Sequence, residues 1–351
     1  MQNRVKINFL SSVTPMKFED IRPFLLYNFK SDHELIKAIE ELSLKFTQER
    51  EHITDYLSDP RLVSAYAAFY LTTNIPKLEA VFKWLPAAWL EELKKTDFVD
   101  LGAGPGTFSL AYKNWGGSGS ITQIEISSLM QEQARALMKG LYPTAELHQM
   151  KSWKGEKGKP KFVLFGHSAN EMGADVALRY LREIDPDHIL FIEPGTKTFF
   201  PEMLKIRDAL IQDGFHNLYP CPTQEACPMR QSANDWCHQF IHVSHSQDVE
   251  RLSQMMKKDR KLLPLTVHAF SKTYGPADQT QRLVRVLPST KFSFEWEVCT
   301  GGDIEHYQIM KRPYDKKAIK ELEEVLAGAS LEVELEKDLE KSKRVKLLNI
   351  K

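Results

Sequence analysis

The sequence predicts an α/β protein centred on a doubly wound parallel sheet. Short apolar runs alternate with helical segments from residue 96 to about residue 214, a pattern typical of βαβ units. A glycine-rich turn follows the first of these runs, and all four cysteines lie beyond the last of them. We therefore expect a helical region over 1–95, a ligand-binding α/β domain over 96–218 and a cysteine-rich extension over 219–314.

The first 95 residues are predicted to be helical. Ser31-Asp32 can cap a helix whose apolar residues recur at helical spacing, and further helices are expected from about Arg61 and over 77–85. This region has neither a glycine loop nor paired acids. We expect it to be a lid or docking module, with the chemistry elsewhere.

The α/β domain is predicted from four apolar runs, at 98–101, 121–126, 162–165 and 189–192, with helices fitting at 128–140 and 176–183. Parallel sheets of this kind bind ligands beyond the carboxyl ends of their strands. The residues directly after each run are therefore the candidates for a functional site.

The extension contains strand-like runs at 265–271, 291–298 and 307–311. The last two are joined by a turn at 300–303, which predicts a β-hairpin. From residue 315 to the last residue, alternating Glu and Lys predict a charged C-terminal helix or tail.

The charge balance limits the choice of partners. Lys plus Arg and Asp plus Glu number 47 each in 351 residues, so no global field draws the protein onto nucleic acid. No run approaches the roughly 20 apolar residues of a membrane span, and the first thirty residues lack a signal-peptide pattern. We expect a soluble cytoplasmic protein (mitochondrial matrix if eukaryotic) that has neither a membrane nor DNA as a partner.

Contact with RNA would then depend on local basic groups, each of which is more often simply a solvated face. Three groups stand out: Arg251, Lys257, Lys258, Arg260 and Lys261; Lys311, Arg312, Lys316, Lys317 and Lys320; and five lysines between Lys151 and Lys161.

The glycine-rich turn predicts a nucleoside cofactor. It reads Asp100-Leu101-Gly102-Ala103-Gly104-Pro105-Gly106-Thr107, and glycines at alternate positions let the backbone approach a ligand closely. A dinucleotide fingerprint needs glycine or alanine at position 107, where threonine stands. The acid-first pattern instead resembles motif I of class I S-adenosylmethionine-dependent methyltransferases. That resemblance assigns the cofactor to Asp100, Gly102, Ala103, Gly104 and Gly106.

Glu125 ends the second predicted strand. Its two carboxylate oxygens suit the two ribose hydroxyls of a bound nucleoside. Enzymes that bind NAD use the same acid, so Glu125 indicates a nucleoside without distinguishing the two cofactors.

Candidate catalytic residues follow the third run, where methyltransferases keep side chains that face the substrate. His167 could act as a base because its pKa lies near neutrality, and Asn170 or Glu171 could bind a substrate edge. A plain helix cap explains Asn170 and Glu171 equally simply. The Asn/Asp-Pro-Pro-aromatic motif of amino-group methylases is missing here.

The grouping of Cys221, Cys227, Cys237 and Cys299 predicts a metal site. Soft thiolates select zinc or iron–sulfur clusters, and four cysteines are the usual ligands of a [4Fe–4S] centre. Two disulfides, inert thiols, or zinc held by three cysteines and one of His238, His242 and His245 remain alternatives. The spacing is not that of a zinc ribbon, which shows paired C-x2-C knuckles.

A family resemblance rests on three segments. They are Glu193-Pro194-Gly195-Thr196, then Pro220-Cys221-Pro222 with Cys227-Pro228, then Asp235-Trp236-Cys237-His238. Together with the glycine turn and the late Cys299, they resemble the ribosomal small-subunit methyltransferase-like family, which includes yeast mitochondrial Rsm-twenty-two and bacterial relatives. The resemblance covers roughly residues 55 to 315.

The resemblance implies a Rossmann-like class I methyltransferase fold beside a [4Fe–4S] cluster held by the four cysteines. It also implies S-adenosylmethionine as cofactor and the assembling small ribosomal subunit, with its 16S-type rRNA, as partner. The chain departs from relatives at 223–226 and at Gln239, which could alter the surroundings of the cluster. Two alternatives stay open: an assembly factor without catalysis, and a zinc-binding RNA methyltransferase.

Overall fold

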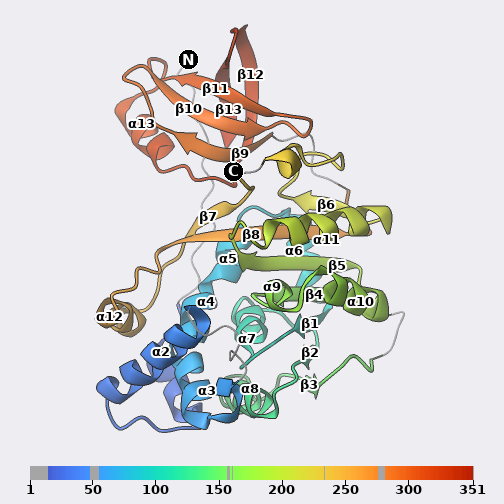
Figure 1. The fold of residues 1–351 in the computed structure, drawn as a ribbon, viewed down its shortest axis with the longest axis vertical. Coiled ribbons are helices and arrows are strands. Elements are labelled where there is room, and N and C mark those ends of the chain that lie inside the picture. The colour runs from blue at the N-terminus through green and yellow to red at the C-terminus, as the bar shows by residue number, and fades with distance from the viewer. Residues whose placement is uncertain are drawn as a thin grey trace.

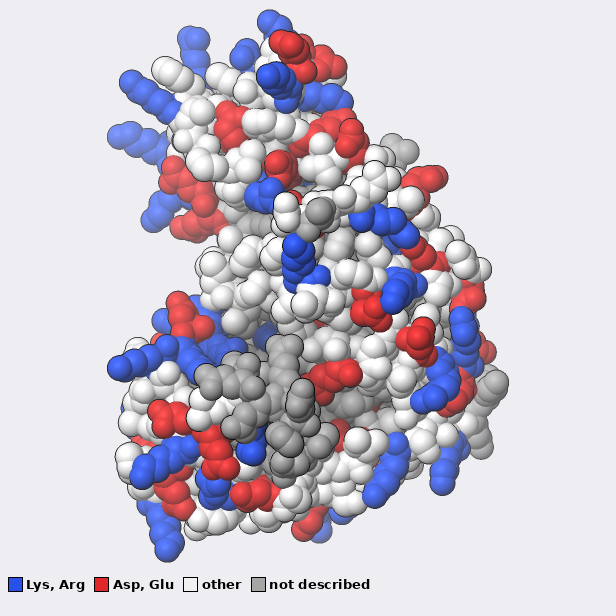
Figure 2. Space-filling model, in the orientation of Figure 1, with Lys and Arg blue, Asp and Glu red and all other residues white. Residues whose placement is uncertain are grey.

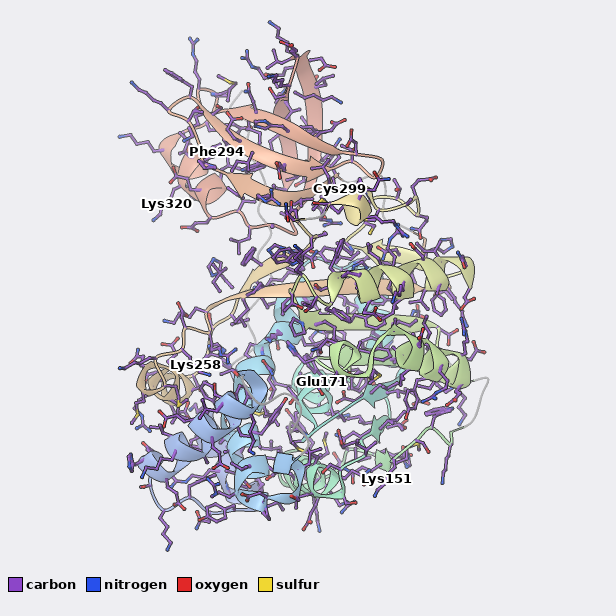
Figure 3. All side chains as sticks on the ribbon, in the orientation of Figure 1. Lys151, Glu171, Lys258, Phe294, Cys299 and Lys320 are labelled. Atoms are coloured by element: carbon purple, nitrogen blue, oxygen red, sulfur yellow. The ribbon has the colours of Figure 1, made fainter. Side chains whose placement is uncertain are left out.

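The structure is a computed structural model that describes residues 15–47, 55–155, 159, 161–232, 234–275 and 281–350. Figure 1 shows a helical region at one end, a central sheet with helices on both faces and a β-barrel at the other end. The four cysteines belong to the region between the barrel and the sheet, where Figure 3 labels Cys299. No helix among these residues is long and apolar enough to cross a membrane.

The N-terminal region is helical, and it shares its core with the sheet. Trp89 is fully buried and donates from Nε1 to Nδ1 of His188 on the sheet, at 3.0 Å. Leu62, Phe69 and Leu78 belong to the same buried cluster as Phe98 and Phe162 of the central strands. These helices are therefore part of the main folding unit. They are α1 (Phe18–Ile21), η1 (Arg22–Phe24), α2 (Asp32–Thr47), η3 (Asp55–Ser58), α3 (Pro60–Tyr66), η4 (Ala67–Leu71), α4 (Thr72–Asn74), α5 (Pro76–Phe82) and α6 (Ala87–Leu93).

The central sheet has the order β3-β2-β1-β4-β5-β8-β6, with β7 pairing to β8. Its first five strands are parallel. The alternation of runs and helices predicts this arrangement for β1, β2, β4 and β5, whereas β3 was not predicted. They are β1 (Asp97–Leu101), β2 (Ile121–Ile124), β3 (Leu147–Met150), β4 (Lys161–Gly166) and β5 (His188–Pro194). The helices between and after them are α7 (Thr107–Asn114), α8 (Ser128–Leu141), α9 (Ala169–Met172), α10 (Ala174–Ile184) and α11 (Phe200–Gln212).

The sheet is mixed where the sequence predicts only parallel strands. β8 (Leu262–Ser271) lies between β5 and β6 (His216–Tyr219) and is antiparallel to both. Residues 265–271 were expected in the extension, but this run is buried along its length because it lies in the interior of the main sheet. The short strand β7 (Gln239–His242), the turn η5 (Pro228–Gln231) and α12 (Gln247–Met255) complete the segment between β6 and β8.

The C-terminal part is a closed five-stranded barrel with the order β10-β11-β13-β12-β9. Its core contains the fully buried Trp296 together with Phe294 and Leu347. The elements are β9 (Gln281–Leu287), β10 (Ser293–Cys299), β11 (Ile304–Met310), α13 (Lys316–Glu323), β12 (Ser330–Asp338) and β13 (Lys343–Ile350). Residues 315–351 were expected to be a charged helix or tail. Within the described residues 315–350 only α13 is helical. Two strands follow it, because apolar side chains such as Leu331, Val345 and Leu347 point into the barrel between charged neighbours.

Candidate cofactor cavity and cysteine site

A cavity of about 930 Å³ lies at the carboxyl ends of β1, β2, β4 and β5. The glycine turn and Glu125 form one wall of the cavity. Tyr66, Tyr70 and Lys77 come from the N-terminal helices, and Arg260 comes from the segment before β8. The helical region, predicted to be a lid or docking module, therefore supplies part of the wall itself. The volume of the cavity lies within the range of small-molecule and cofactor sites.

The glycine turn depends on backbone conformations that only glycine adopts without strain. Gly102, Gly104 and Gly106 have φ angles of +72°, +53° and +85°. A Cβ atom on Gly102 would lie 2.4 Å from Cβ of Ser168, whereas one on Gly104 would meet nothing within 4 Å. Gly102 thus permits close packing against the turn after β4, and Gly104 presents bare backbone. Gly102, Ala103 and Gly104 line the cavity, but Gly106 does not.

Asp100 lies beneath the turn, outside the cavity lining. It is buried, and its Oδ2 accepts hydrogen bonds from the backbone N and the Oγ of Ser109, at 2.9 and 2.7 Å. Burial raises the pKa of Asp100 to about 7, although both bonds to Ser109 favour the charged form. Asp100 therefore joins β1 to the first turn of α7 and acts on the cavity only through the loop.

Glu125 lies directly against the glycine turn. Its Oε2 accepts from the backbone N of Gly104 at 2.8 Å, and its Oε1 accepts from the backbone N of Ser127 at 2.8 Å. A carboxylate has about four acceptor positions, so both oxygens can take a further donor from the cavity. This geometry couples the residue predicted to bind a ribose to the loop predicted to bind the same molecule.

His167 forms a buried hydrogen-bonded pair with Lys77, which no sequence pattern marked as a site residue. His167 has a φ angle of +61°, and its Nε2 lies 2.7 Å from Nζ of Lys77. Burial lowers the pKa of His167 well below its ordinary value, and repulsion from the charge of Lys77 adds to this shift. Burial also lowers the pKa of Lys77 to about 7, and the charge of Arg260 adds to the shift. At neutral pH His167 is uncharged and is a weaker base than its ordinary pKa implies.

The same wall carries a cation without a counter-ion. The Arg260 guanidinium lies 5.7 Å from the ring centroid of Tyr70 and 6.0 Å from that of Phe69, and its buried Nε has no hydrogen-bond partner. Among the residues that the structure describes, neither Lys77 nor Arg260 forms an ion pair. Lys77 is buried and Arg260 is half-buried, and cations that are removed from water are costly unless a ligand supplies negative charge.

Asn170 and Glu171 both line the cavity, and Figure 3 labels Glu171 at the carboxyl ends of the central strands. The backbone around Asn170 is held by Glu193, whose carboxylate accepts from the backbone N of Ser168 and of Ala169, at 3.1 and 2.9 Å. Burial raises the pKa of Glu193 to about 8. Glu193 fixes the turn after β4, and its position at the end of an apolar run could have identified it. Lys77 lies in the helix α5, away from any strand end, so its position gave no comparable sign of a site residue.

The four cysteines line one cavity between the sheet and the barrel. Cys221 and Cys227 lie between β6 and η5, Cys237 precedes β7, and Cys299 ends β10. All four are free thiols, so the disulfide alternative is wrong for this structure. Burial raises the pKa of Cys237 well above its ordinary value, and repulsion from the neighbouring sulfurs adds to this shift. Burial also raises the pKa of Cys299 to about 11. Gly301 permits the close approach of the β10–β11 turn, since a Cβ atom there would lie 2.3 Å from Thr223.

Two buried arginines face these sulfurs. Arg207 donates from Nε to Sγ of Cys221 at 3.2 Å and also pairs with Asp208. Arg282 donates to the carbonyl oxygens of Pro220 and Gly328, at 2.8 and 3.0 Å. In the described part of the chain Arg282 has no carboxylate partner, so the sulfurs are the groups that could neutralise it.

Gln239, one of the positions where the chain departs from its relatives, contacts the site. Its Nε2 donates to Sγ of Cys237 at 3.6 Å, and its Oε1 accepts from the backbone N of Val267 at 2.8 Å. No histidine lines the cysteine cavity, and His245 instead lies 3.3 Å from the carbonyl oxygen of Thr73. Among the described residues, no three His, Cys, Asp or Glu side chains converge on a point where one metal ion could be held.

The sequence matches the model of one protein family, described as the mitochondrial small ribosomal subunit family Rsm22, over residues 60–291. The match spans more than half of the chain and includes the glycine turn, the turn after β4 and all cysteines except Cys299. The chain belongs to this family. The family links the chain to the small ribosomal subunit, and the parallel central strands with helices on both faces make its fold Rossmann-like. Comparison with curated proteins found no match.

Solved structures that match part of this chain include several methyltransferases. Magnesium protoporphyrin IX methyltransferase of Synechocystis, with S-adenosylmethionine bound, is 11% identical with a TM-score of 0.38, over 70% of this chain and 99% of that one. TrmK of M. capricolum, with S-adenosylhomocysteine, is 10% identical with a TM-score of 0.33, over 55% and 71%. Precorrin-6y C5,15-methyltransferase of Geobacter metallireducens is 16% identical with a TM-score of 0.33, over 53% and 87%. At this level of similarity they carry no argument about fold, activity or substrate.

Proposed function

We propose that the cavity binds S-adenosylmethionine and that the protein is a methyltransferase of the small ribosomal subunit. The observation that carries the proposal is the cavity itself, in which the bare backbone of Gly104 and the carboxylate of Glu125 meet at the carboxyl ends of β1 and β2. Glu125 would bind the ribose hydroxyls. The cationic wall of Lys77 and Arg260 would bind the carboxylate of the cofactor's methionine part.

The bound cofactor would supply an electrophilic methyl group. The chain's own contribution is to orient cofactor and substrate in a cavity whose walls come from several elements. Asn170 and Glu171 would contact the substrate, and His167 would accept a hydrogen bond from it or from Lys77. An assembly factor without catalysis is the second candidate, favoured by the missing amino-group methylase motif after β4.

We also propose that the four cysteines hold a [4Fe–4S] cluster. Four thiolates with no competing histidine are the usual donor set of such a cluster, and N–H donors to the sulfurs are typical of its surroundings. A cubane takes one thiolate on each iron, so its ligands need not converge on one point as those of a zinc ion must. The negative charge of the thiolates would neutralise Arg282. The cluster would hold the barrel against the sheet.

Three experiments separate these parts. Calorimetry with S-adenosylhomocysteine tests the cofactor, and iron and sulfide analysis of anaerobically purified protein tests the cluster. One stoichiometric zinc in colourless protein would refute the cluster and leave a thiolate site. Mapping small-subunit rRNA methylation with and without the protein tests the reaction. Cofactor binding with an unchanged methylation map would favour the assembly factor.

Partner binding is tested by sedimentation of tagged protein with small-subunit assembly particles, in the compartment where these particles form (cytoplasm, or mitochondrial matrix in a eukaryote). Phosphate contacts make such binding fall steeply with salt. We expect association at low salt that is lost in Cys299→Ser and kept in Gly104→Val. Equal retention of the cysteine variant would refute a structural role of the cluster in partner binding.

A further inference from the structure

The C-terminal barrel has a connectivity that is associated with binding single strands. β9, β10 and β11 form an antiparallel meander, α13 follows β11, and β13 returns parallel to β11 and antiparallel to β12. β12 then closes the barrel against β9. This is the strand order of the OB-fold, whose second and third strands and connecting loops bind oligonucleotides or oligosaccharides. Most of the barrel lies beyond residue 291, where the family match ends.

One edge of this barrel concentrates positive charge beside an exposed aromatic ring. The loop between β9 and β10 carries Lys291 and Phe292, and the chain after β11 packs against it, since the backbone N of Lys311 donates to the carbonyl oxygen of Phe292 at 2.8 Å. Phe292 is 67% exposed. We name this surface the basic edge, and it consists of Lys291, Phe292, Lys311, Arg312, Lys316, Lys317 and Lys320.

The charge of the basic edge is largely uncompensated. Among the neighbouring acids, Asp315 caps α13 by accepting from the backbone N of Ala318 at 2.8 Å, and Glu321 lies 3.8 Å from Lys317. Within the described residues, Lys291, Arg312 and Lys320 have no ion pair. Figure 2 shows Lys and Arg side chains projecting from the barrel end of the molecule, and Figure 3 labels Lys320 there.

The basic side chains of the first group mostly interact with other parts of the protein. Arg251 pairs with Asp32, Lys258 bonds Ser43, and Arg260 points into the cofactor cavity. The group at 151–161 lies partly outside the described residues. The face of β10 and β11 that points away from the barrel core carries paired charges, with Glu295 bonded to His306 at 2.6 Å and Glu297 to Arg285 at 2.8 Å. The unpaired positive charge of the basic edge therefore attracts a polyanion more strongly than this strand face does.

We infer that the basic edge binds single-stranded RNA, with an unpaired base stacked on Phe292 and phosphates on Lys291 and Arg312. Base stacking on an aromatic side chain combined with a basic track is how OB-folds hold single strands. The positive charge favours a polynucleotide over an oligosaccharide. The inference depends on the proposed function only for the identity of the natural strand, because strand binding can be measured without a ribosome.

The test measures fluorescence anisotropy of a labelled, unstructured oligouridine of about 12 nucleotides with the full chain. Phe292→Ala should weaken binding about tenfold or more by removing the stacking surface. Arg312→Gln should weaken binding and reduce the slope of log K against log salt by about 0.7. The matched controls are Leu335→Ala, an apolar residue 54% exposed on β12, and Lys37→Gln on the distant helix α2. Both should bind like the wild type.

Wild-type affinity in Phe292→Ala and Arg312→Gln would overturn the inference, as would equal affinity for the same strand in a duplex. S-adenosylhomocysteine binding is measured on the same proteins and should be unchanged in every variant. Strand binding without cofactor binding in the wild type would refute the proposed cofactor site and leave the basic edge standing. Cofactor binding without strand binding would refute the basic edge as a strand-binding surface and leave the proposed cofactor site standing.

Discussion

Replacing Lys77 with methionine tests the cationic wall of the cavity. Lys77 is buried, and its pKa is lowered from 10.5 to about 7, mainly by burial. This shift corresponds to about 5 kcal/mol by which the empty cavity disfavours the charged amine. A bound carboxylate would reverse part of that cost, so S-adenosylhomocysteine should take up a proton on Lys77 whenever the pH lies above the pKa of the empty protein.

The sign of the pH dependence follows from this uptake. Near pH 6 Lys77 is already protonated, so the ligand gains the full interaction. Above pH 7 the ligand must bind together with a proton, and the affinity of the wild type should fall about tenfold per pH unit up to the pKa of the complex. Lys77→Met should bind about ten- to a hundredfold more weakly near pH 6 because it lacks the charge-assisted hydrogen bond. It should also lack this part of the pH dependence.

Calorimetry from pH 6 to pH 9 measures both effects. The ammonium group of the ligand titrates equally with both proteins and cancels in their difference. Lys83→Met, an exposed lysine at the end of the same helix, is the matched control and should behave as the wild type. Methylthioadenosine, which lacks the carboxylate, should bind both proteins alike. A Lys77→Met variant with the wild-type affinity and pH profile would refute the reasoning.

Three further variants test other parts of the site. Glu125→Gln should weaken S-adenosylhomocysteine about tenfold or more in calorimetry, since a charged acceptor for the ribose is lost; unchanged affinity would show that the ribose assignment is wrong. Asp100→Ala should lower the free energy of unfolding by about 1–3 kcal/mol in urea titrations because the Ser109 donors lose their acceptor, and full wild-type stability would contradict this. Cys299→Ser should lose the brown colour and the iron and become less soluble, because cluster binding and folding are coupled; a variant with full iron content would exclude Cys299 as a ligand.

The sequence predicts the local parts of this structure well and their long-range pairing poorly. The alternation of apolar runs predicts β1, β2, β4 and β5 because each strand and its helix are neighbours along the chain. β3 was missed because its four residues form no apolar run. The insertion of β8 between β5 and β6 depends on a pairing across more than 70 residues, which no local pattern records. β12 and β13 were missed because the charged side chains around their apolar residues also fit a solvated helix.

The candidate site divides in the same way. The turn at Gly102–Gly104 and Glu125 could be predicted since glycines and an acid directly after strands have few other uses. Lys77 and Arg260 could not, because their significance arises only when a helix and a distant segment fold over the sheet. Asp100 illustrates a third case, in which the motif predicts an important residue but the structure places it beneath the ligand cavity, bonded to Ser109.

The cysteine site is connected by a hydrogen bond to the cavity at the carboxyl ends of the central strands. Trp236, next to Cys237, donates from Nε1 to the carbonyl oxygen of Gly195 at 3.0 Å, and Gly195 lines the cofactor cavity. On the other side of the site, Tyr219 stacks on Trp84 with 5.1 Å between the ring centroids. The Tyr219 hydroxyl also donates to the carbonyl oxygen of Gly328, which belongs to the barrel. The four sulfurs therefore lie where the sheet, the N-terminal helices and the barrel meet. A cluster bound there would stabilise the wall of the cavity and the position of the basic edge together, so loss of iron should weaken cofactor and strand binding in one step.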